Sequence, residues 1–204
     1  MSSPAAPVCL IHAFSERADQ RGGTLIAEFV TDRDEHLSRL ADPDGYRPES
    51  CPHCDHHRLH AHDFRERKIR HQGVATFRRY RCALCRAVWM VLAGFVARHL
   101  HRCWAFVQAA MTQRGLLEGE PPQPKEVEVP ERTLQRWTCR LETSAEVVVA
   151  AFSESGVDLG QAAKAKSRVE LVGSMIRERL VSPARALAEL AGWLHRISPG
   201  LRVM

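Results

Sequence analysis

Two Cys-x-x-Cys pairs are the residues of this sequence best suited to chemistry. Cys51 and Cys54 enclose Pro-His, and after 27 further residues Cys82 and Cys85 enclose Ala-Leu. A tetrahedral zinc ion takes four ligands, with Zn–S distances of about 2.3 Å, and each such turn supplies two thiolates. The intervening segment is long enough for two strands and a turn that bring both pairs together. We therefore expect one structural zinc ion, bound by Cys51, Cys54, Cys82 and Cys85.

Other interpretations of these cysteines are redox dithiols and chance spacing, but two pairs at this separation favour zinc. Several histidines surround the first pair, and one of them could replace a cysteine as a ligand. We favour the interpretation that they are polar or DNA-facing side chains, because four cysteines already complete the shell. These histidines are His53, His56, His57, His60 and His62.

The residue that follows each Cys-x-x-Cys turn often takes a left-handed backbone conformation, which glycine tolerates best. Asp55 and Arg86 occupy these positions here. Aspartate is acceptable in that conformation, whereas arginine is less comfortable. We therefore expect the backbone around the cysteines to differ locally from the common form.

A four-cysteine shell leaves no open coordination position, so it is structural rather than catalytic. The sequence contains no Ser-His-Asp arrangement, glycine-rich phosphate loop or nucleophile elbow. Cys9, Cys103 and Cys139 are single thiols on apolar segments, which predicts that they are buried in the core. We therefore expect no enzymatic activity.

The whole composition is that of a globular chain in a reducing compartment. The 204 residues include seven cysteines, an odd number in a chain too long for a typical disulfide mini-scaffold. The first residues lack the basic start and apolar core of a signal peptide. The longest apolar runs, such as residues 88–96, are too short to span a bilayer. We expect a soluble, cytoplasmic protein without a membrane partner.

Positive charge is concentrated around the cysteines. The chain carries a net charge of +5, whereas residues 51–102 alone hold 11 Lys/Arg and three Asp/Glu. Such a concentration is typical of a phosphate-binding surface, and arginine in particular makes forked contacts with phosphate or guanine. The alternative is a solvated face whose arginines pair with acidic neighbours. The predicted nucleic-acid contacts in this region are Arg65, Arg67, Lys68, Arg70, Arg78, Arg79 and Arg81.

A second candidate contact surface is the segment PERTLQRWTCRLE, residues 130–142. As a helix, it would place Leu134, Trp137 and Leu141 on an apolar side. The opposite side could enter a major groove of DNA, or it could be an ordinary surface. The residues predicted for that polar side are Arg132, Gln135, Arg136 and Arg140.

The patterns together predict an α+β protein, in which a small four-cysteine zinc β-ribbon joins a mostly helical C-terminal half. We divide the chain into an N-terminal α/β segment (1–47), a zinc ribbon (48–97), helix-turn-helix-like helices (98–142) and a C-terminal helical region (143–204). Apolar spacing predicts a strand over 8–14 and one or two helices over 24–42. Residues 58–82 predict two strands with a turn at Gln72–Gly73, and residues 87–95 predict another strand.

Helical periodicity dominates the second half of the sequence. Ser182 and Pro183 are suited to the N-cap and first position of the last helix. Residues 118–130 form a proline-rich connection. The predicted helices cover residues 97–117, with Gly115 as a stop, and residues 130–142, 144–156, 167–180 and 182–196.

The order of these features resembles the zinc-ribbon plus helix-turn-helix segment of insertion-sequence transposases. It is also similar to a family of uncharacterised bacterial zinc-ribbon proteins thought to be transposase-related. The Cys-Pro-x-Cys pair, the basic hairpin, FRRYRCALC, the apolar strand and the TLQRW helix carry the resemblance, over roughly residues 46–142. The resemblance implies a bacterial protein that contacts duplex DNA.

Two departures limit what the resemblance implies. The slot for a compact middle helix is filled by the proline-rich residues 118–130, which disfavour a helix. Residues 143–204 look helical and leave no room for an RNase H-like catalytic core with three metal-binding carboxylates. The expected function is therefore that of a transposon-related accessory or regulatory DNA-binding protein.

The alternative function is a zinc-stabilised adaptor that binds a protein partner or a second copy of the chain. Its contact surface would lie on the C-terminal helices and include Trp193 and Leu194. An adaptor does not need its positive charge concentrated on the hairpin. The concentration of charge there therefore favours DNA binding.

Overall fold

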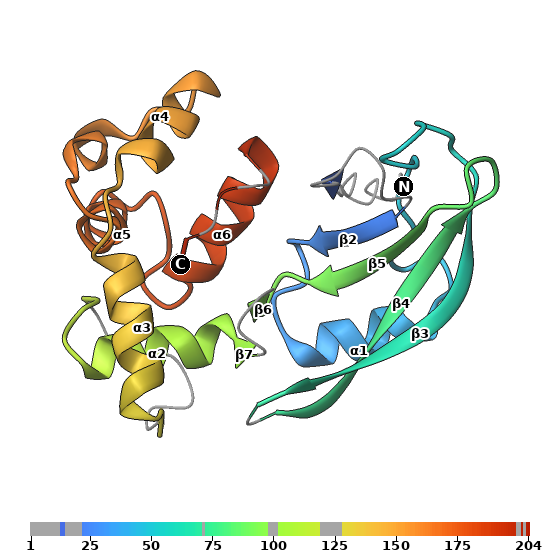
Figure 1. Cartoon of the computed structure of the whole chain (residues 1–204), viewed down its shortest axis with the longest axis horizontal. Coiled ribbons are helices and arrows are strands. Elements are labelled where there is room, and N and C mark those ends of the chain that lie inside the picture. The colour runs from blue at the N-terminus through green and yellow to red at the C-terminus, as the bar shows by residue number, and fades with distance from the viewer. Residues whose placement is uncertain are drawn as a thin grey trace, which may run out of the picture. The chain divides into compact units, whose positions relative to one another are not determined.

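The structure, a computed structural model, describes residues 13–14, 22–70, 72–97, 102–118, 128–198, 201 and 203–204. The chain forms two compact units (Figure 1). Unit 1 comprises residues 1–67 and 75–94, and unit 2 comprises residues 68–74 and 95–204. Unit 1 holds a sheet and one helix, and unit 2 is mostly helical, so the predicted α+β class is confirmed.

The sheet joins the N-terminal segment to the strands around the cysteines. Its order is β1-β2-β5-β4-β3, with β2 parallel to β5 and β4 antiparallel to β5. Gly73 has a φ of 80° and forms the predicted turn between β3 and β4. The strands are β1 (Ala13–Phe14), β2 (Gly22–Ala27), β3 (Leu59–Ile69), β4 (Gly73–Cys82) and β5 (Val88–Ala93).

The prediction of one or two helices over residues 24–42 is wrong for residues 24–27. Residues 24–27 belong to β2, which pairs with β5 in the register Leu25↔Val91. A short apolar run fits a buried strand as well as a helix, and the partner strand decides between them. The second half does form a helix, α1 (Arg33–Ala41), which is capped by the carboxylate of Asp32.

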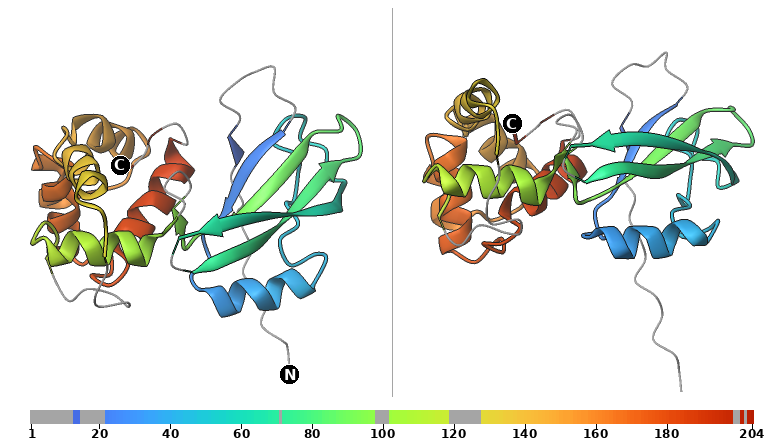
Figure 2. Two further views of the ribbon diagram at one scale, coloured as in Figure 1. Left: turned by 60° about the horizontal axis from the view of Figure 1, so that its bottom comes forward. Right: turned by 90° about the horizontal axis from the view of Figure 1, so that it is seen from below.

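Helix α1 covers one face of the sheet (Figure 2). Its buried His36 contacts β4, because the ring Nε2 lies 2.9 Å from the carbonyl oxygen of Thr76. The other ring nitrogen, Nδ1, lies 2.5 Å from the hydroxyl oxygen of Tyr46. A carbonyl can only accept, so Nε2 carries the proton and Nδ1 accepts from Tyr46.

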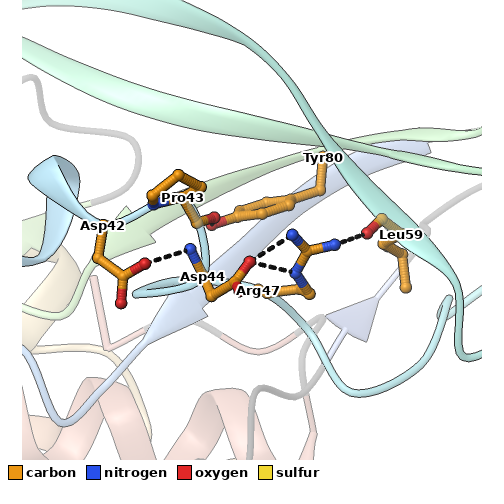
Figure 3. A network of polar contacts seen from close by, with 6 residues as sticks. All are labelled: Asp42, Pro43, Asp44, Arg47, Leu59 and Tyr80. Carbon is orange, nitrogen blue, oxygen red and sulfur yellow. Dashed lines mark hydrogen bonds and ion pairs between the residues drawn. The ribbon is translucent and has the colours of Figure 1, made fainter.

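The segment that leads into the first cysteine pair is tied to the sheet by a polar network (Figure 3). The Tyr80 hydroxyl donates to the carbonyl of Pro43 at 2.9 Å. Arg47 donates to the carboxylate of Asp44 and to the carbonyl of Leu59. These bonds hold residues 43–47 against β3 and β4, close in sequence to Cys51.

Unit 2 begins with a two-stranded pair, β6 (Val96–Ala97) and β7 (Arg102–Cys103). The predicted helix over 97–117 is therefore shorter than expected, and its first part pairs as a strand. Gly115, with a φ of 68°, follows the end of this helix as predicted. The helices are α2 (Trp104–Gln113), α3 (Glu131–Leu141), α4 (Glu146–Glu154), the 3₁₀ helix η1 (Gly160–Lys164), α5 (Arg168–Arg177) and α6 (Ala186–Ile197).

Helix α6 begins later than the sequence predicts. Its first residue is Ala186, so Ser182 is not the N-cap and Pro183 is not the first helical residue. The buried side chain of Gln108 in α2 donates to the Pro183 carbonyl and accepts from the backbone N–H of Leu187 at 3.1 Å. A residue far away in the sequence thus satisfies an N–H in the first turn, which local capping rules cannot foresee.

Several predictions fall outside the described residues. They concern residues 8–12 of the predicted first strand, Cys9, residues 98–101 before α2, and most of the proline-rich connection, residues 119–127. Within the described part of the chain, no helix has both the length and the apolar character needed to cross a bilayer.

Candidate metal centre and basic surfaces

The four predicted ligands come together in unit 1. Cys51 and Cys54 lie in the turn before β3, which we call the first knuckle, and Cys82 and Cys85 lie in the turn between β4 and β5, the second knuckle. The backbone N–H of Cys51 donates to the carbonyl of His56 at 2.9 Å. The N–H of Cys82 donates to the carbonyl of Ala87, also at 2.9 Å. In both knuckles the first cysteine is thus bonded to the residue five positions later.

The expected local departure after each knuckle does not occur. Asp55 has a φ of 55° and Arg86 a φ of 65°, so both adopt the left-handed conformation. Arginine takes this conformation at some cost in backbone strain, as a rule of order 1–3 kcal/mol for a non-glycine residue. The surrounding turn therefore overrides the local preference of Arg86, and the common backbone form is kept.

The sulfur positions fit a tetrahedral metal ion. Sγ of Cys51 lies 3.6 Å from that of Cys85, and Sγ of Cys54 lies 3.6 Å from that of Cys82. All four sulfur atoms lie within 4.8 Å of one another. A tetrahedron with metal–sulfur bonds of about 2.3 Å has edges of about 3.8 Å. The sulfurs of the two knuckles thus interleave around one point, as four ligands of a single ion do.

Protonation of the cluster is uneven. Burial acts to raise the pKa of Cys82, but backbone N–H groups of Cys85 and Leu84 and the neighbouring thiols lower it to about 7. Burial and the neighbouring cysteines raise the pKa of Cys85 to about 12. Four thiolates this close repel one another, and the positive charge of a divalent cation would compensate that repulsion and keep its ligands deprotonated.

The histidines near the first knuckle lie outside the four-cysteine cluster. Among the described residues, the metal-ligating group contains cysteines alone. His57 is engaged elsewhere, because its Nδ1 lies 3.1 Å from the carbonyl oxygen of Glu49. His53, His60 and His62 are exposed, and His56 is half-buried.

Four of the predicted nucleic-acid contacts lie on one face of the β3–β4 strand pair. Arg65 and Arg67 share a face of β3 with Asp63, because alternate residues of a strand point the same way. Asp63 is bound by Arg79 of β4, which places Arg79 and Arg81 on that face as well. Arg65 and Arg81 are exposed, and Arg67 is half-buried.

Two arginines of this region are occupied inside the protein. Arg78 is 9% exposed, lies 4.3 Å over the ring of Phe64 and donates to the carbonyl of Leu40 at 2.7 Å. Arg79 makes a forked ion pair with Asp63, and that guanidinium lowers the pKa of the carboxylate. Arg78 therefore anchors α1 to the sheet, and charge on Arg79 is already balanced.

Lys68 and Arg70 belong to unit 2 and line a pocket there. Arg102 and Arg114, which the sequence analysis did not select, line the same pocket. Arg102 is the first residue of the short strand β7 and Arg114 follows helix α2, so no spacing rule joins them to the hairpin. Local charge density alone could have drawn attention to Arg102, because it ends the basic region of residues 51–102.

Helix α3 has the two sides that the sequence predicts. Leu134, Trp137 and Leu141 are buried. The residues of the opposite side are exposed, and three of them form a stripe of arginines spaced four residues apart. The exposed residues are Arg132, Gln135, Arg136 and Arg140.

Cys103 and Cys139, which lie outside the four-cysteine cluster, differ in their exposure to solvent. Cys103 is buried, as predicted, and burial raises its pKa. Cys139 is exposed, so the prediction of burial is wrong for it. Position 139 lies on α3 away from the buried side formed by Leu134, Trp137 and Leu141, and the apolar neighbours in sequence are not neighbours on the helix face.

Comparison with protein-family models gives a match to one part of the chain. A family model described as "Domain of unknown function (DUF6431)" matches residues 51–137. The match begins at the first metal-ligand candidate, Cys51, and ends within α3, at Trp137. It thus spans both knuckles, the basic hairpin and the pocket-lining arginines. Comparison with curated proteins and with solved structures gives no match.

Proposed function

We propose that this chain is a zinc-ribbon DNA-binding protein, an accessory or regulatory factor of a mobile element. Zinc is the ion proposed for the cluster, since four thiolates in a tetrahedron suit it and the closed shell suits a structural role. The ion would hold both knuckles together and thereby fix the start of β3 and the end of β4. No reaction step is assigned to it.

The observation that carries the proposal is the exposed cationic face of β3 and β4. Within the described residues, Arg65, Arg67 and Arg81 make no ion pair with a carboxylate. Unpaired arginines that share one face of a rigid strand pair are suited to phosphates of a duplex, because each neutralised phosphate releases a counterion. The metal cluster at the end of the same strands would keep that face in shape.

Helix α3 supplies a second proposed contact. Arg132, Arg136 and Arg140 lie four residues apart, and like charges at this spacing destabilise an isolated helix by a few tenths of a kcal/mol per pair. A phosphate backbone or a groove of DNA would relieve this repulsion. Helix α3 packs against α2, and we propose that this pair acts as the helix-turn-helix-like element.

The adaptor alternative has less support. Leu194 is 1% exposed and Trp193 packs edge-on against Phe152 at a centroid distance of 5.8 Å. Leu194 therefore belongs to the core of unit 2, and Trp193 is half-buried, so neither residue is a fully open contact surface. A complex that forms with protein alone and ignores nucleic acid would nevertheless favour the adaptor.

The direct experiment is fluorescence polarisation with a labelled duplex of mixed sequence at low salt. We expect saturable binding, with a dissociation constant in or below the micromolar range, as for proteins that make several phosphate contacts. Absence of binding to duplex DNA under these conditions would refute the proposal. Light scattering of the same sample without DNA would reveal a stable homo-oligomer, which is one of the two forms of the adaptor alternative.

A further inference from the structure

A pocket in unit 2 contains a buried arginine, Arg102, which is 2% exposed. Its Nη1 makes no hydrogen bond with any residue in the described part of the chain. Its guanidinium carbon lies 4.8 Å from the ring centre of Phe106 and 5.3 Å from that of Trp137. Burial lowers the pKa of Arg102, as does the charge of Arg70, yet an arginine remains protonated.

A buried charge of this kind is costly. Removing a guanidinium from water costs several kcal/mol unless an opposite charge or hydrogen bonds compensate it. Among the described residues, no carboxylate forms an ion pair with Arg102. The two aromatic rings offset part of this desolvation penalty, since a desolvated cation–π contact contributes about 2 kcal/mol. They do not supply an acceptor for Nη1.

The pocket around Arg102 is positively charged and large. Its volume is about 940 Å³, at the upper end of the range of small-molecule sites. Among the described residues, four cationic side chains and two carboxylates line it, which gives these residues an excess of two positive charges. Its charged lining residues are Lys68, Arg70, Arg102, Arg114, Glu128 and Glu131.

The two ends of the pocket differ in net charge. Glu131 already binds Arg114, so this pair is balanced. Lys68 and Arg70 stand exposed on the hairpin side and form no ion pair within the described residues. Pro130 and Glu131 line the pocket at the start of α3, whose N-terminus carries a partial positive charge. Arg102, Arg70 and Lys68 therefore make one compact donor group.

We infer that this pocket binds a phosphate monoester, carried either by a free nucleotide or by the end of a nucleic-acid strand. A monoester carries close to two negative charges at neutral pH, which matches the excess of the lining, whereas an internal phosphodiester carries one. Its terminal oxygens can accept from the fork of Arg102 and from Arg70 and Lys68 together. The inference goes beyond the proposed function, because a nucleotide can bind here whether or not the chain binds duplex DNA.

Calorimetry on the metal-loaded full chain tests the inference, with deoxyadenosine 5′-monophosphate and deoxyadenosine as paired probes. We expect saturable binding of the monophosphate and none of the nucleoside. Arg70→Ala, at an exposed position, should weaken binding about tenfold, because it removes a charge-assisted hydrogen bond. Arg102→Lys keeps the charge but loses the forked pair of guanidinium N–H donors. It should weaken binding of the monophosphate by a similar factor. The control Arg185→Ala removes an exposed charge before α6, outside the pocket, and should change the affinity less than twofold.

A second pair of probes identifies the source of the phosphate. A 5′-phosphorylated single strand is compared with the same strand ending in a 5′-hydroxyl. A preference for the phosphorylated strand that disappears in Arg70→Ala identifies a strand end, and binding of the mononucleotide without that preference identifies a free nucleotide. The inference is overturned if no monoester binds, or if Arg70→Ala and Arg102→Lys both bind like the wild type. Duplex binding through the hairpin face with no monoester binding would overturn this inference alone and leave the proposed function intact.

Discussion

The sulfur atoms of Cys51 and Cys85 lie 3.6 Å apart although the two residues are 34 positions apart in the chain. The sheet makes this approach possible, because β3 and β4 are neighbours and each runs from or into a knuckle. The distance matches an edge of a thiolate tetrahedron. One ion at this point would therefore fasten both ends of the basic hairpin.

Metal binding is the first prediction. The purified chain should contain about one zinc ion per molecule, and Cys51→Ser combined with Cys82→Ser should abolish it. Because a structural zinc site contributes about 10 kcal/mol or more of binding energy to folding, unit 1 should lose its cooperative unfolding transition in the variant. Mass spectrometry of the metal and thermal unfolding would measure both effects. Cys139→Ser, an exposed lone thiol, is the matched control and should retain the ion.

The four-cysteine cluster and the hairpin were predictable because their signals are local. Two Cys-x-x-Cys turns, an alternating pattern and Gly73 each report on a few neighbouring residues. Strand β2 was not predictable, because its partner β5 lies more than 60 positions away and decides strand over helix. The start of α6 was missed for the same reason, since Gln108 acts from 79 positions away.

The location of the basic surface was predictable. Which of its arginines are occupied inside the protein was not. Arg78 and Arg79 read alike in the sequence, yet they point to opposite faces of β4. One lies against Phe64 and the other binds Asp63. The pocket around Arg102 could not be predicted either, because its lining comes from the hairpin, β7 and the segments around α2 and α3.

His36 gives a second prediction, on the pH dependence of stability. Burial lowers the pKa of His36, as does the charge of Arg33, although the bond to Thr76 opposes them. Below the unfolded value of about 6.5, the unfolded chain therefore binds a proton that the folded chain resists. Stability from this residue is present above that pH and is lost as the pH falls below it.

The variant His36→Gln isolates this contribution. It should destabilise unit 1 by roughly 2 kcal/mol at neutral pH, because two buried hydrogen bonds are removed or weakened. Its unfolding free energy should then fall less steeply than that of the wild type between about pH 6.5 and pH 5. Urea unfolding at several pH values measures both slopes, and identical slopes would show that His36 does not titrate in this way.

Tyr80 gives a third prediction, on the segment before the first knuckle. Tyr80→Phe removes the donor to the Pro43 carbonyl and leaves that carbonyl without this partner. We expect a loss of about 1 kcal/mol in the unfolding free energy, typical of one hydrogen bond. The metal content should stay unchanged, since the cysteines are untouched. An unfolding free energy equal to or above that of the wild type would contradict the role given to this bond.

The most direct test of DNA binding through the hairpin face is the salt dependence of duplex affinity. The variant Arg65→Ala/Arg67→Ala/Arg81→Ala removes the three arginines of this face that form no ion pair within the described residues, and it spares the inward Arg78 and the paired Arg79. A control with the same loss of charge replaces three exposed residues of unit 2 by alanine, namely Lys164, Lys166 and Arg185.

We expect the slope of log affinity against log salt to become shallower by about 0.9 for each phosphate that the variant no longer neutralises, or roughly 2 to 3 in all. The charge-matched control should keep a slope close to that of the wild type. If the hairpin variant and the control shift the slope equally, or if neither shifts it, the basic face of β3 and β4 does not bind DNA.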